Sequence, residues 1–344
     1  MLIAHHLLLG DTLMLTALVA KLRAVHPRAH LAMTVPTAIA PLYATRPWGL
    51  EALPFDPRRP ASTLWEGAAF DLAFVPGDNR YTWLAAAMRA RWIVAFDGER
   101  RRRKSWPADR LVGYPDAPAS WGDMVAALAD GPPPPPYDPR QWPAPPSRPV
   151  DAPRSPYALL HVGASTPLKR WAPDRWLEVA RALDARGLAP VWSCGPGERE
   201  LVDACDPAHR YAFTGGALDL AQMRALLDRA ALLVSPDTGI AHLGRIAGTP
   251  SVTLLGPGSA VLTGPGRYFA AMPWRAASVD PFPCRDQRIL FGREIAWVRR
   301  CGRSPTECPR ALCMDAVGVD AVLAAVDDAL ALPDPRVARQ QAVS

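Results

Sequence analysis

Short apolar runs alternate with segments of helical periodicity throughout the second half of the chain. Runs such as YALLHVG and SVTLLG have the length of buried strands, whereas APDRWLEVARALDARG carries its apolar residues at the spacing of a helix face. Strands that alternate with helices in this way are typical of a parallel sheet covered on both faces. We therefore predict a doubly wound α/β domain here. Its expected strands are 157–163, 189–195, 231–235 and 251–256, and its expected helices are 172–187, 197–205, 219–230 and 238–248.

The first half of the chain repeats this alternation less regularly. The apolar stretch 1–10 leads into a helical pattern over 11–27, and further buried strands are expected at 30–36, 71–77 and 91–96. Open α/β sheets bind ligands at the carboxyl ends of their strands. Two halves of this kind therefore predict a ligand-binding cleft between two α/β domains.

Prolines crowd into one segment between these halves, GPPPPPYDPRQWPAPPSRPVDAPRSP. Proline has no backbone N–H and a fixed φ, so this segment cannot be a helix interior or a central strand. It is typical of an extended connection between domains. We accordingly expect an N-terminal domain at 1–140, a linker at 141–156, a C-terminal domain at 157–330 and a flexible tail at 331–344.

The length of 344 residues suits two domains, and the net charge of +6 with a pI of 9.2 suits anionic partners. Nucleotides, phosphorylated glycans and acidic membrane surfaces fit this charge, as does a generic basic surface with no partner. No nucleic-acid-binding motif is present, so nucleic acid is not an expected partner. We also find neither a membrane-spanning run nor a signal peptide, and therefore expect a cytoplasmic protein.

The polar string SPDTGIAHL separates an expected strand from an expected helix. A helix N-terminus presents free N–H groups and a partial positive charge, which attract phosphate. Thr238 adds a hydroxyl, Gly239 permits close approach of a ligand, and His242 lies about one turn further on. The alternative is that Asp237 only caps the helix and His242 is a half-buried core residue.

Two more strand-end loops carry polar residues of similar character. Ser165, Thr166 and Lys169 follow the strand at 157–163, and they could hold a diphosphate through hydroxyls and an ammonium group. Glu198, or else Glu200, follows the next strand and could accept hydrogen bonds from a ribose. Each loop alone is equally compatible with an ordinary strand–helix connection. Together, the three loops favour a nucleotide-diphosphate site.

Asp11 lies where the first strand of the N-terminal half meets its first helix. A carboxylate in this position could remove a proton from an attacking hydroxyl, although it could equally cap the helix. No GxGxxG segment opens either half, which argues against a dehydrogenase.

A basic run in the same half suits an anionic acceptor or an acidic membrane surface. A solvated charge cluster is the alternative. The candidate acceptor-binding residues are Arg80, Arg101, Arg102, Arg103 and Lys104, with Arg100 beside them.

Four of the six cysteines fall in one C-terminal stretch. They contain no CxxC pair, and reduced, packed thiols are the alternative to a structural zinc or iron ion bound by four thiolates. The candidate ligands are Cys284, Cys301, Cys308 and Cys313.

Four segments, taken in order, resemble glycosyltransferase family 9, the ADP-heptose-dependent lipopolysaccharide heptosyltransferases. They span about residues 10 to 259 and read GDTLMLTALVAKLRAVHP, HVGASTPLKRWAPDRWLEVA, CGPGERELV and VSPDTGIAHLGRIAGTPSVTLLGPGS. Departures occur at Ala17, where the family often has proline, and at Gly244 and Arg245, where small apolar residues are usual. The last of the four blocks is the most specific.

The resemblance implies a GT-B fold, in which two Rossmann-like, doubly wound domains face a cleft. It further implies inverting transfer of heptose from ADP-heptose to an anionic glycan or lipid-linked acceptor such as the lipopolysaccharide inner core, without a catalytic cofactor. Peripheral contact with the inner face of the cytoplasmic membrane is compatible with such an acceptor and with the basic run. Asp11 would be the general base, and Glu198 would bind the adenosine ribose. The diphosphate would be held by Ser165, Thr166 and Lys169, and the donor phosphate and sugar by Asp237, Thr238, Gly239 and His242. The alternatives are a different nucleotide sugar and a non-catalytic sugar-nucleotide-binding protein.

Overall fold

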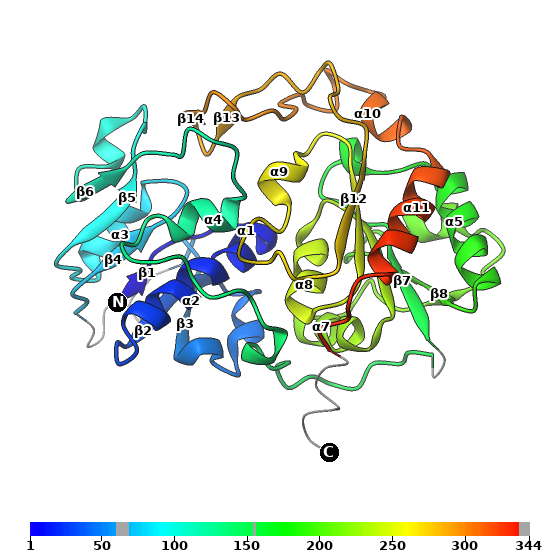
Figure 1. Ribbon diagram of the computed structural model, residues 1–344, viewed down its shortest axis with the longest axis horizontal. Coiled ribbons are helices and arrows are strands. Elements are labelled where there is room, and N and C mark those ends of the chain that lie inside the picture. The colour runs from blue at the N-terminus through cyan, green and yellow to red at the C-terminus, as the bar shows by residue number, and fades with distance from the viewer. Residues whose placement is uncertain (60–68, 154–155, 337–344) are drawn as a thin grey trace. The chain divides into compact units, whose positions relative to one another are not determined.

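The computed structural model describes residues 1–59, 69–153 and 156–336, which form two compact units (Figure 1). Each unit is an α/β fold built on one parallel six-stranded sheet. Unit 1 contains Met1–Pro145, Gly266–Ala270 and Arg288–Val298, and unit 2 contains Pro146–Pro265, Ala271–Gln287 and the chain from Arg299 onward. The domain boundaries expected from the sequence did not assign Gly266–Ala270 and Arg288–Val298 to the N-terminal unit.

The sheet of unit 1 has the strand order β3-β2-β1-β4-β5-β6. The order reverses between β1 and β4, which creates a topological switch point at the carboxyl ends of these strands. The sequence predicted β1, β2, β4 and β5 but not the edge strands β3 and β6, whose residues are mostly only half-buried and carry no continuous apolar run. The strands are β1 (Leu2–Ile3), β2 (Leu31–Pro36), β3 (Leu50–Phe55), β4 (Ala73–Val75), β5 (Ile93–Phe96) and β6 (Arg110–Val112).

The single helix expected over 11–27 is in fact two helices. The break lies at Leu15, and the Thr16 hydroxyl donates a hydrogen bond of 2.5 Å to the Leu13 carbonyl beside it. Lys21 is buried on the second helix because its ammonium donates to the Ala129 carbonyl at 2.6 Å. The helices of unit 1 are α1 (Leu9–Met14), α2 (Thr16–Val25), α3 (Tyr81–Ala87) and α4 (Trp121–Ala126).

The sheet of unit 2 has the order β12-β11-β10-β7-β8-β9 and contains all four strands predicted for this half. The predicted parallel, doubly wound architecture is therefore confirmed. Its switch point lies between β7 and β10. The strands are β7 (Tyr157–His161), β8 (Ala189–Ser193), β9 (Ala212–Phe213), β10 (Leu232–Pro236), β11 (Ser251–Leu255) and β12 (Trp274–Ser278).

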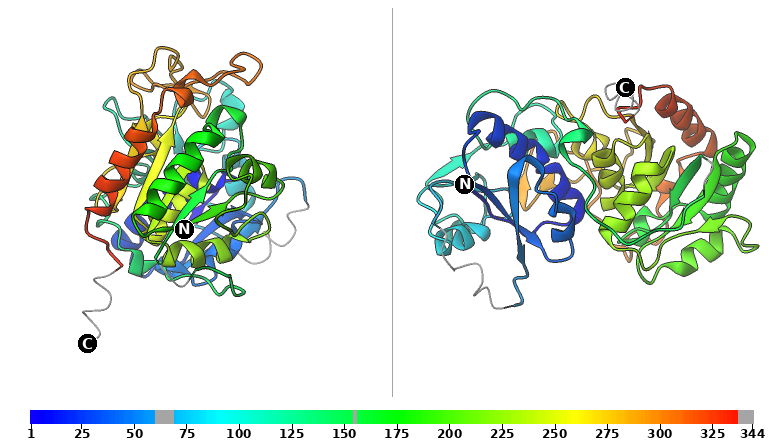
Figure 2. Two further views of the ribbon diagram at one scale, coloured as in Figure 1. Left: turned by 90° about the vertical axis from the view of Figure 1, so that its right-hand side faces the viewer. Right: turned by 90° about the horizontal axis from the view of Figure 1, so that it is seen from below.

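Helices cover both faces of this sheet. On one face, α5 (Pro173–Ala185) lies beside α11 (Val319–Leu330), which the sequence analysis did not predict (Figures 1 and 2). On the other face, α8 (Gly239–Ala247) packs so closely that a Cβ at Gly244 would lie 2.5 Å from the Leu233 side chain. This close packing accounts for glycine at 244. The remaining helices are α6 (Arg199–Cys205), α7 (Leu220–Arg229), α9 (Ala260–Thr263) and α10 (Leu312–Asp315).

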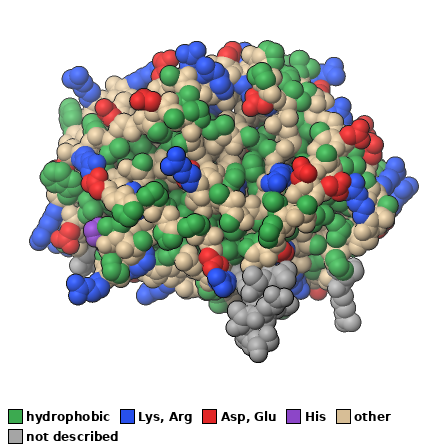
Figure 3. All heavy atoms as spheres, in the orientation of Figure 1, with side chains coloured by type: hydrophobic (Ala, Val, Ile, Leu, Met, Phe, Trp, Pro, Cys, Tyr) green, Lys and Arg blue, Asp and Glu red, His purple; other side chains and the backbone are tan. Residues whose placement is uncertain are grey.

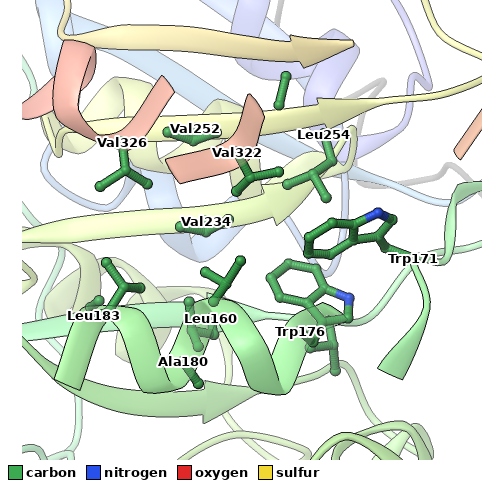
Figure 4. Packing of buried hydrophobic residues seen from close by; sticks show 14 of the residues in the cluster. Leu160, Trp171, Trp176, Ala180, Leu183, Val234, Val252, Leu254, Val322 and Val326 are labelled. Carbon is green, nitrogen blue, oxygen red and sulfur yellow. The ribbon is translucent and has the colours of Figure 1, made fainter. Parts of the chain in front are cut away.

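Trp171 and Trp176 anchor the core beneath α5 and α11. Their rings meet edge to face with centroids 5.4 Å apart, and α11 contributes Val322 and Val326 to the same cluster (Figure 4). Burial of aromatic and branched side chains of this size contributes roughly 2 kcal/mol each relative to exposure. The core therefore fixes the strands whose carboxyl ends carry the candidate site.

The proline-rich stretch and the C-terminal tail are partly anchored. Trp142 is buried in unit 1 and its indole N–H donates to the Leu42 carbonyl at 3.1 Å, so the start of the expected linker packs as part of this unit. In unit 2, the Arg336 guanidinium donates to the Ala230 carbonyl at 2.8 Å. Residues 154–155 of the expected linker and 337–344 of the expected tail lie outside the described residues.

The late part of the chain also forms a small antiparallel hairpin and several short turns. The hairpin consists of β13 (Ile289–Leu290) and β14 (Arg293–Glu294) and belongs to unit 1. The 3-10 turns are η1 (Ala40–Tyr43), η2 (Pro47–Gly49), η4 (Arg102–Lys104), η5 (Pro139–Gln141) and η6 (Pro167–Lys169).

Among the described residues, no helix is both long enough and apolar enough to cross a membrane. Charged groups are distributed over the surface. On the face drawn in Figure 3, Lys and Arg side chains are interspersed with Asp and Glu side chains. The net positive charge therefore does not form one continuous basic surface on this face.

Candidate functional site

Three polar loops of unit 2 lie at the carboxyl ends of adjacent strands. The loops follow β7, β8 and β10, and β7 is hydrogen-bonded to both other strands. Because the strands are parallel, these loops emerge at the same edge of the sheet, around its switch point. The sequence-predicted donor-binding residues of all three loops are thereby brought to one place.

The loop after β10 delivers the N-terminus of α8. Thr238 occupies the N-cap position with extended backbone angles, and Gly239 is the first helical residue. The Thr238 hydroxyl is buried and has no hydrogen-bond partner among the described residues. The first amide groups of the helix also have no partner within the helix. An unsatisfied hydroxyl beside unsatisfied N–H groups is suited to an anionic ligand.

Lys169 connects the loops after β7 and β10. Its ammonium donates to the Asp237 carbonyl oxygen at 2.6 Å and to the carboxylate Oδ2 at 3.0 Å. Asp237 is buried, and a Cβ at Gly258 would lie only 2.6 Å from the same Oδ2. The ammonium has a third N–H to offer another acceptor. Asp237 therefore holds the Lys169 ammonium in place, and its direct contact with the donor stays a prediction.

Glu198 joins the loops after β7 and β8. Its two carboxylate oxygens accept hydrogen bonds from the amides of Ala164 at 3.1 Å and Gly195 at 2.9 Å. A Cβ at Gly195 would lie 2.7 Å from this carboxylate, and one at Gly163 would overlap it. The glycines thus make room for the glutamate. Each oxygen retains a lone pair for a ribose hydroxyl, so the expected role is compatible with this contact.

His242 is a neutral imidazole in this site. Burial lowers its pKa to about 3, and the positive charge of Arg245 adds to the shift. Arg245 is itself buried, which lowers its pKa to about 10, and its guanidinium donates to the Thr263 carbonyl at 2.9 Å. The imidazole can therefore donate a hydrogen bond to a ligand, but it does not contribute a positive charge near neutral pH.

The remaining two sequence-predicted residues of this site lie in the loop after β7. Ser165 is exposed, whereas the Thr166 hydroxyl accepts from the Leu168 amide at 3.4 Å and so caps η6. This cap orients the turn that ends at Lys169. Thr166 therefore acts on Lys169 through the backbone, while Ser165 is accessible to a ligand.

In unit 1, Asp11 and the loop after β4 lie at the carboxyl edge of the sheet. Asp11 is half-buried in the first turn of α1, the helix that follows β1 after a short loop. A Cβ at Gly77 in the β4 loop would approach the Leu7 side chain to 3.0 Å. The loops after β1 and β4 therefore meet at the switch point of this unit, as they do in unit 2.

Arg293, on β14, organises the β4 and β5 loops from within. This buried guanidinium donates to the Gly77 carbonyl at 2.7 Å, the Asp97 carbonyl at 2.7 Å and the Asn79 Oδ1 at 2.6 Å. The Asn79 amide in turn donates to Ser105 Oγ and to the Phe96 carbonyl, each at 2.8 Å. Sequence analysis missed Arg293, because it stands in neither a periodic segment nor a recognised motif, whereas Asn79 lies in the loop after the predicted strand 71–77 that also carries the acceptor candidate Arg80.

The predicted acceptor-binding residues divide into two groups. Asp78 pairs with Arg80 at 2.7 Å and with Lys104 at 3.0 Å. Burial alone would raise the pKa of Asp78, but the hydrogen bonds from these two cations outweigh burial and lower it. Arg101, Arg102 and Arg103 instead have exposed side chains. Arg80 and Lys104 are thus engaged within the protein, whereas these three arginines are available to an anion.

The four C-terminal cysteines line one cavity of about 190 Å³ in unit 2, and none forms a disulfide. Burial raises the pKa of the Cys313 thiol, and the neighbouring Cys284 and Cys301 add to the rise. Leu168, the neighbour of Lys169, lines the same cavity. In the described ranges, no three His, Cys, Asp or Glu side chains are grouped closely enough to hold a metal ion. The structure therefore brings the cysteines together without forming a ligand set.

Residues 68–278 match the family model described as glycosyltransferase family 9 (heptosyltransferase). Lipopolysaccharide heptosyltransferase 3 of Escherichia coli is 27% identical over 138 residues, which cover 38% of this chain and 40% of the relative. The match thus spans about two fifths of the length of the curated relative.

Solved structures of low sequence identity share the fold. The E. coli ADP-heptose LPS heptosyltransferase II has a TM-score of 0.68 and 20% identity, with 96% of this chain and 97% of that chain covered. TibC, an iron-containing dodecameric heptosyltransferase of enterotoxigenic E. coli crystallised with ADP-D-β-D-heptose, has a TM-score of 0.56 and 15% identity, with 95% and 75% covered. These similarities confirm the GT-B fold expected from the sequence.

The buried histidines predict that stability falls in mild acid. Burial lowers the pKa of His242 to about 3 and that of His161 to about 4, both below the ordinary value of 6.5. At a pH between the folded-state pKa of each histidine and its ordinary value of 6.5, the unfolded chain binds more protons than the folded chain. The free energy of unfolding therefore decreases as the pH falls below about 6.5. The decrease should be on the order of 1.4 kcal/mol per pH unit for each histidine.

Urea unfolding of the wild type and of His242→Gln, measured near pH 7 and near pH 5, checks this prediction. The substitution should flatten the pH dependence, whereas His26→Gln, at an exposed position, should leave it unchanged. Equal pH dependence in all three proteins would contradict the assignment.

Proposed function

Because this chain belongs to glycosyltransferase family 9, the heptosyltransferase family, we propose that it transfers heptose from ADP-heptose to a hydroxyl group of an anionic glycan. The observation that carries the proposal is the group formed by Lys169, the unsatisfied Thr238 hydroxyl and the N-terminus of α8. The donor assignment is supported by the structural similarity to the E. coli ADP-heptose LPS heptosyltransferase II. The lipopolysaccharide acceptor is supported by the names of the curated relatives.

In the proposed reaction, unit 2 binds the donor through its diphosphate. The N–H groups at the start of α8 and the third N–H of Lys169 face the phosphate oxygens, and Ser165 adds a hydroxyl. The negative charge on the diphosphate grows as the glycosidic bond breaks, so the fixed ammonium and helix terminus stabilise the transition state more than the ground state. Glu198 accepts hydrogen bonds from the ribose. No cofactor takes part in this catalysis.

Asp11 acts as the general base in this proposal. Its carboxylate takes the proton of the acceptor hydroxyl while the hydroxyl oxygen attacks the anomeric carbon from the side opposite the leaving diphosphate. One bond forms as the other breaks, so the configuration at the anomeric carbon inverts. The negative charge of the acceptor is matched by Arg101, Arg102 and Arg103.

A lipid-linked acceptor of this kind would place the enzyme at the inner face of the cytoplasmic membrane. Two other functions remain consistent with the same site. A GT-B transferase could use a different nucleotide sugar, and a protein without a working Asp11 could bind sugar nucleotides without catalysis. The two experiments that follow separate these alternatives from the proposed function.

Thermal-shift measurements with a panel of nucleotides test the donor. ADP and ADP-heptose should stabilise the protein, by about 2.7 kcal/mol at a ligand concentration of 100 times the Kd, whereas UDP and GDP compounds should not. Lys169→Met should remove most of the ADP-induced shift, measured from its own baseline. Arg186→Met serves as the matched control, because Arg186 is an exposed cation at the end of α5 that pairs with Asp327. Preferential stabilisation by UDP compounds would contradict the assigned donor.

Asp11→Asn should abolish transfer while leaving donor binding intact. The substitution keeps the shape of the side chain but removes the base, so the rate should fall by roughly 100- to 10,000-fold with an unchanged ADP-induced thermal shift. Asp71→Asn is the control, because Asp71 is an exposed carboxylate of the same unit at the amino end of β4. Transfer by Asp11→Asn at the wild-type rate would show that another group is the base.

The four-cysteine cavity is a proposed structural metal site. Four thiolates are the donor set that zinc and iron–sulfur proteins use, and the neighbour TibC is described as iron-containing. The proposal requires the thiols to turn toward a common centre, because their present arrangement does not form a ligand set. A metal ion there would hold the cysteine-bearing loops against Leu168, which lines the same cavity, and would thereby stabilise the turn that carries Lys169.

Elemental analysis of the untagged protein should find about one zinc or iron ion per chain. The double variant Cys301→Ser/Cys308→Ser should lose the metal and melt at a lower temperature. Cys194→Ala, which removes a cysteine of the unit 2 core outside the cavity, should retain it. Metal-free wild-type protein that takes up neither ion on incubation would contradict this site.

A further inference from the structure

Unit 1 carries a run of exposed arginines, one exposed tryptophan that contacts η4 and a second exposed tryptophan that follows η4 in the chain. The indoles of Trp83 and Trp106 are 51% and 71% exposed, which is unusual for side chains of this size. Trp83 is in the first turn of α3, and its N–H donates to the Arg103 carbonyl at 2.8 Å, so the helix and η4 are held together. We call this group, which consists of Trp83, Arg100–Arg103 and Trp106, the Arg–Trp surface.

The arginines of this surface present their guanidinium groups to solvent. Arg100 to Arg103 are all exposed, and their guanidinium groups make no hydrogen bond or ion pair with the described part of the chain. Lys104, the next residue, contrasts with them because it pairs with Asp78 at 3.0 Å and Glu99 at 3.5 Å. Asp78 and Glu99 are thus engaged by Lys104 and Arg80, and none of the four arginines takes part in an ion pair among the described residues.

We propose that the Arg–Trp surface docks unit 1 onto an anionic lipid bilayer. Guanidinium groups near a membrane are attracted by its negative surface potential, and each unpaired arginine adds to the attraction. Exposed indoles partition into the headgroup region, where an amphipathic ring has one apolar and one wet side. A soluble anion would satisfy the arginines alone. The two large indoles beside them favour a surface that accepts both charge and apolar rings.

The position of the surface relates it to the acceptor. The Asn79 amide bonds to Ser105 Oγ and the Phe96 carbonyl, which places η4 at the carboxyl ends of β4 and β5. The loops at this edge include the predicted acceptor-binding residues. Docking here would present these loops to a glycan attached to lipid, a consequence that rests on the proposed function, whereas the docking itself does not.

Sedimentation with lipid vesicles tests the proposal on the full chain. The wild type should bind vesicles of mixed phosphatidylcholine and phosphatidylglycerol at low salt, and bind phosphatidylcholine vesicles weakly. Higher salt should weaken binding, and inorganic phosphate at the same ionic strength should weaken it no more than chloride does. A wild-type protein that ignores anionic vesicles, or that phosphate displaces specifically, would overturn the docking proposal.

Matched variants locate the binding surface. Arg101→Gln/Arg102→Gln/Arg103→Gln should lower vesicle affinity by at least about tenfold. Arg28→Gln/Arg89→Gln/Arg91→Gln removes the same charge from exposed positions at the amino ends of β2 and β5, and should lower it far less. Equal losses in the two triple variants would reduce the effect to net charge and overturn the assigned surface.

A tryptophan pair separates docking from catalysis. Trp106→Ala should weaken vesicle binding several-fold, whereas Trp92→Ala, at a 49% exposed indole before β5, should not. Trp106→Ala should also transfer sugar to a deacylated, water-soluble acceptor at the wild-type rate. Unchanged vesicle binding by Trp106→Ala would contradict the docking proposal, and absent transfer by the wild type onto the soluble acceptor would contradict the proposed function alone.

Discussion

The parallel arrangement of the strands is the constraint on which the candidate residues of both units depend. In a parallel sheet, every strand ends at the same edge, and the loops on either side of the switch point diverge to opposite faces. Unit 1 reverses its strand order between β1 and β4, and unit 2 between β7 and β10. Asp11 follows one of these strands, and Lys169 and Asp237 follow two others. Within unit 2, the sheet therefore brings together Lys169 and Asp237, which are far apart in the sequence.

Within these edges, the loops are held by a small number of ionic and carboxylate contacts to the backbone. Glu198 accepts hydrogen bonds from the backbone amides of two separate loops. Lys169 donates to both the carbonyl and the carboxylate of Asp237. Arg293 donates to backbone carbonyls of two loops. Contacts of charged groups with backbone are stronger than neutral ones and leave few alternative loop conformations. They require space, which glycine provides at 195 and 258. The fixed conformation of the loops therefore depends on glycine at these positions.

Much of unit 2 could be predicted from its sequence because its strands are buried on both faces. A strand such as β10 is buried at every residue and begins with an apolar run, and a helix such as α5 has a clear apolar stripe, so the alternation is visible. The edge strands β3 and β6 lack that signal. The break between α1 and α2 also escaped prediction, because the apolar periodicity continues through Leu15. Hydrophobic patterning thus reveals the core but not the local departures from it.

The candidate site was predictable only where a motif stands at a strand end. Lys169 and Glu198 belong to such segments, but the sequence could not show that Asp237 faces Lys169 or that Arg245 lies against His242. Charge illustrates the same limit. Arg245, Arg285 and Arg293 are buried and donate to backbone carbonyls, so they add to the net charge without being accessible to a ligand. The capacity of this protein to bind anions is therefore decided by which cations the fold leaves accessible to a ligand, and not by the total of +6.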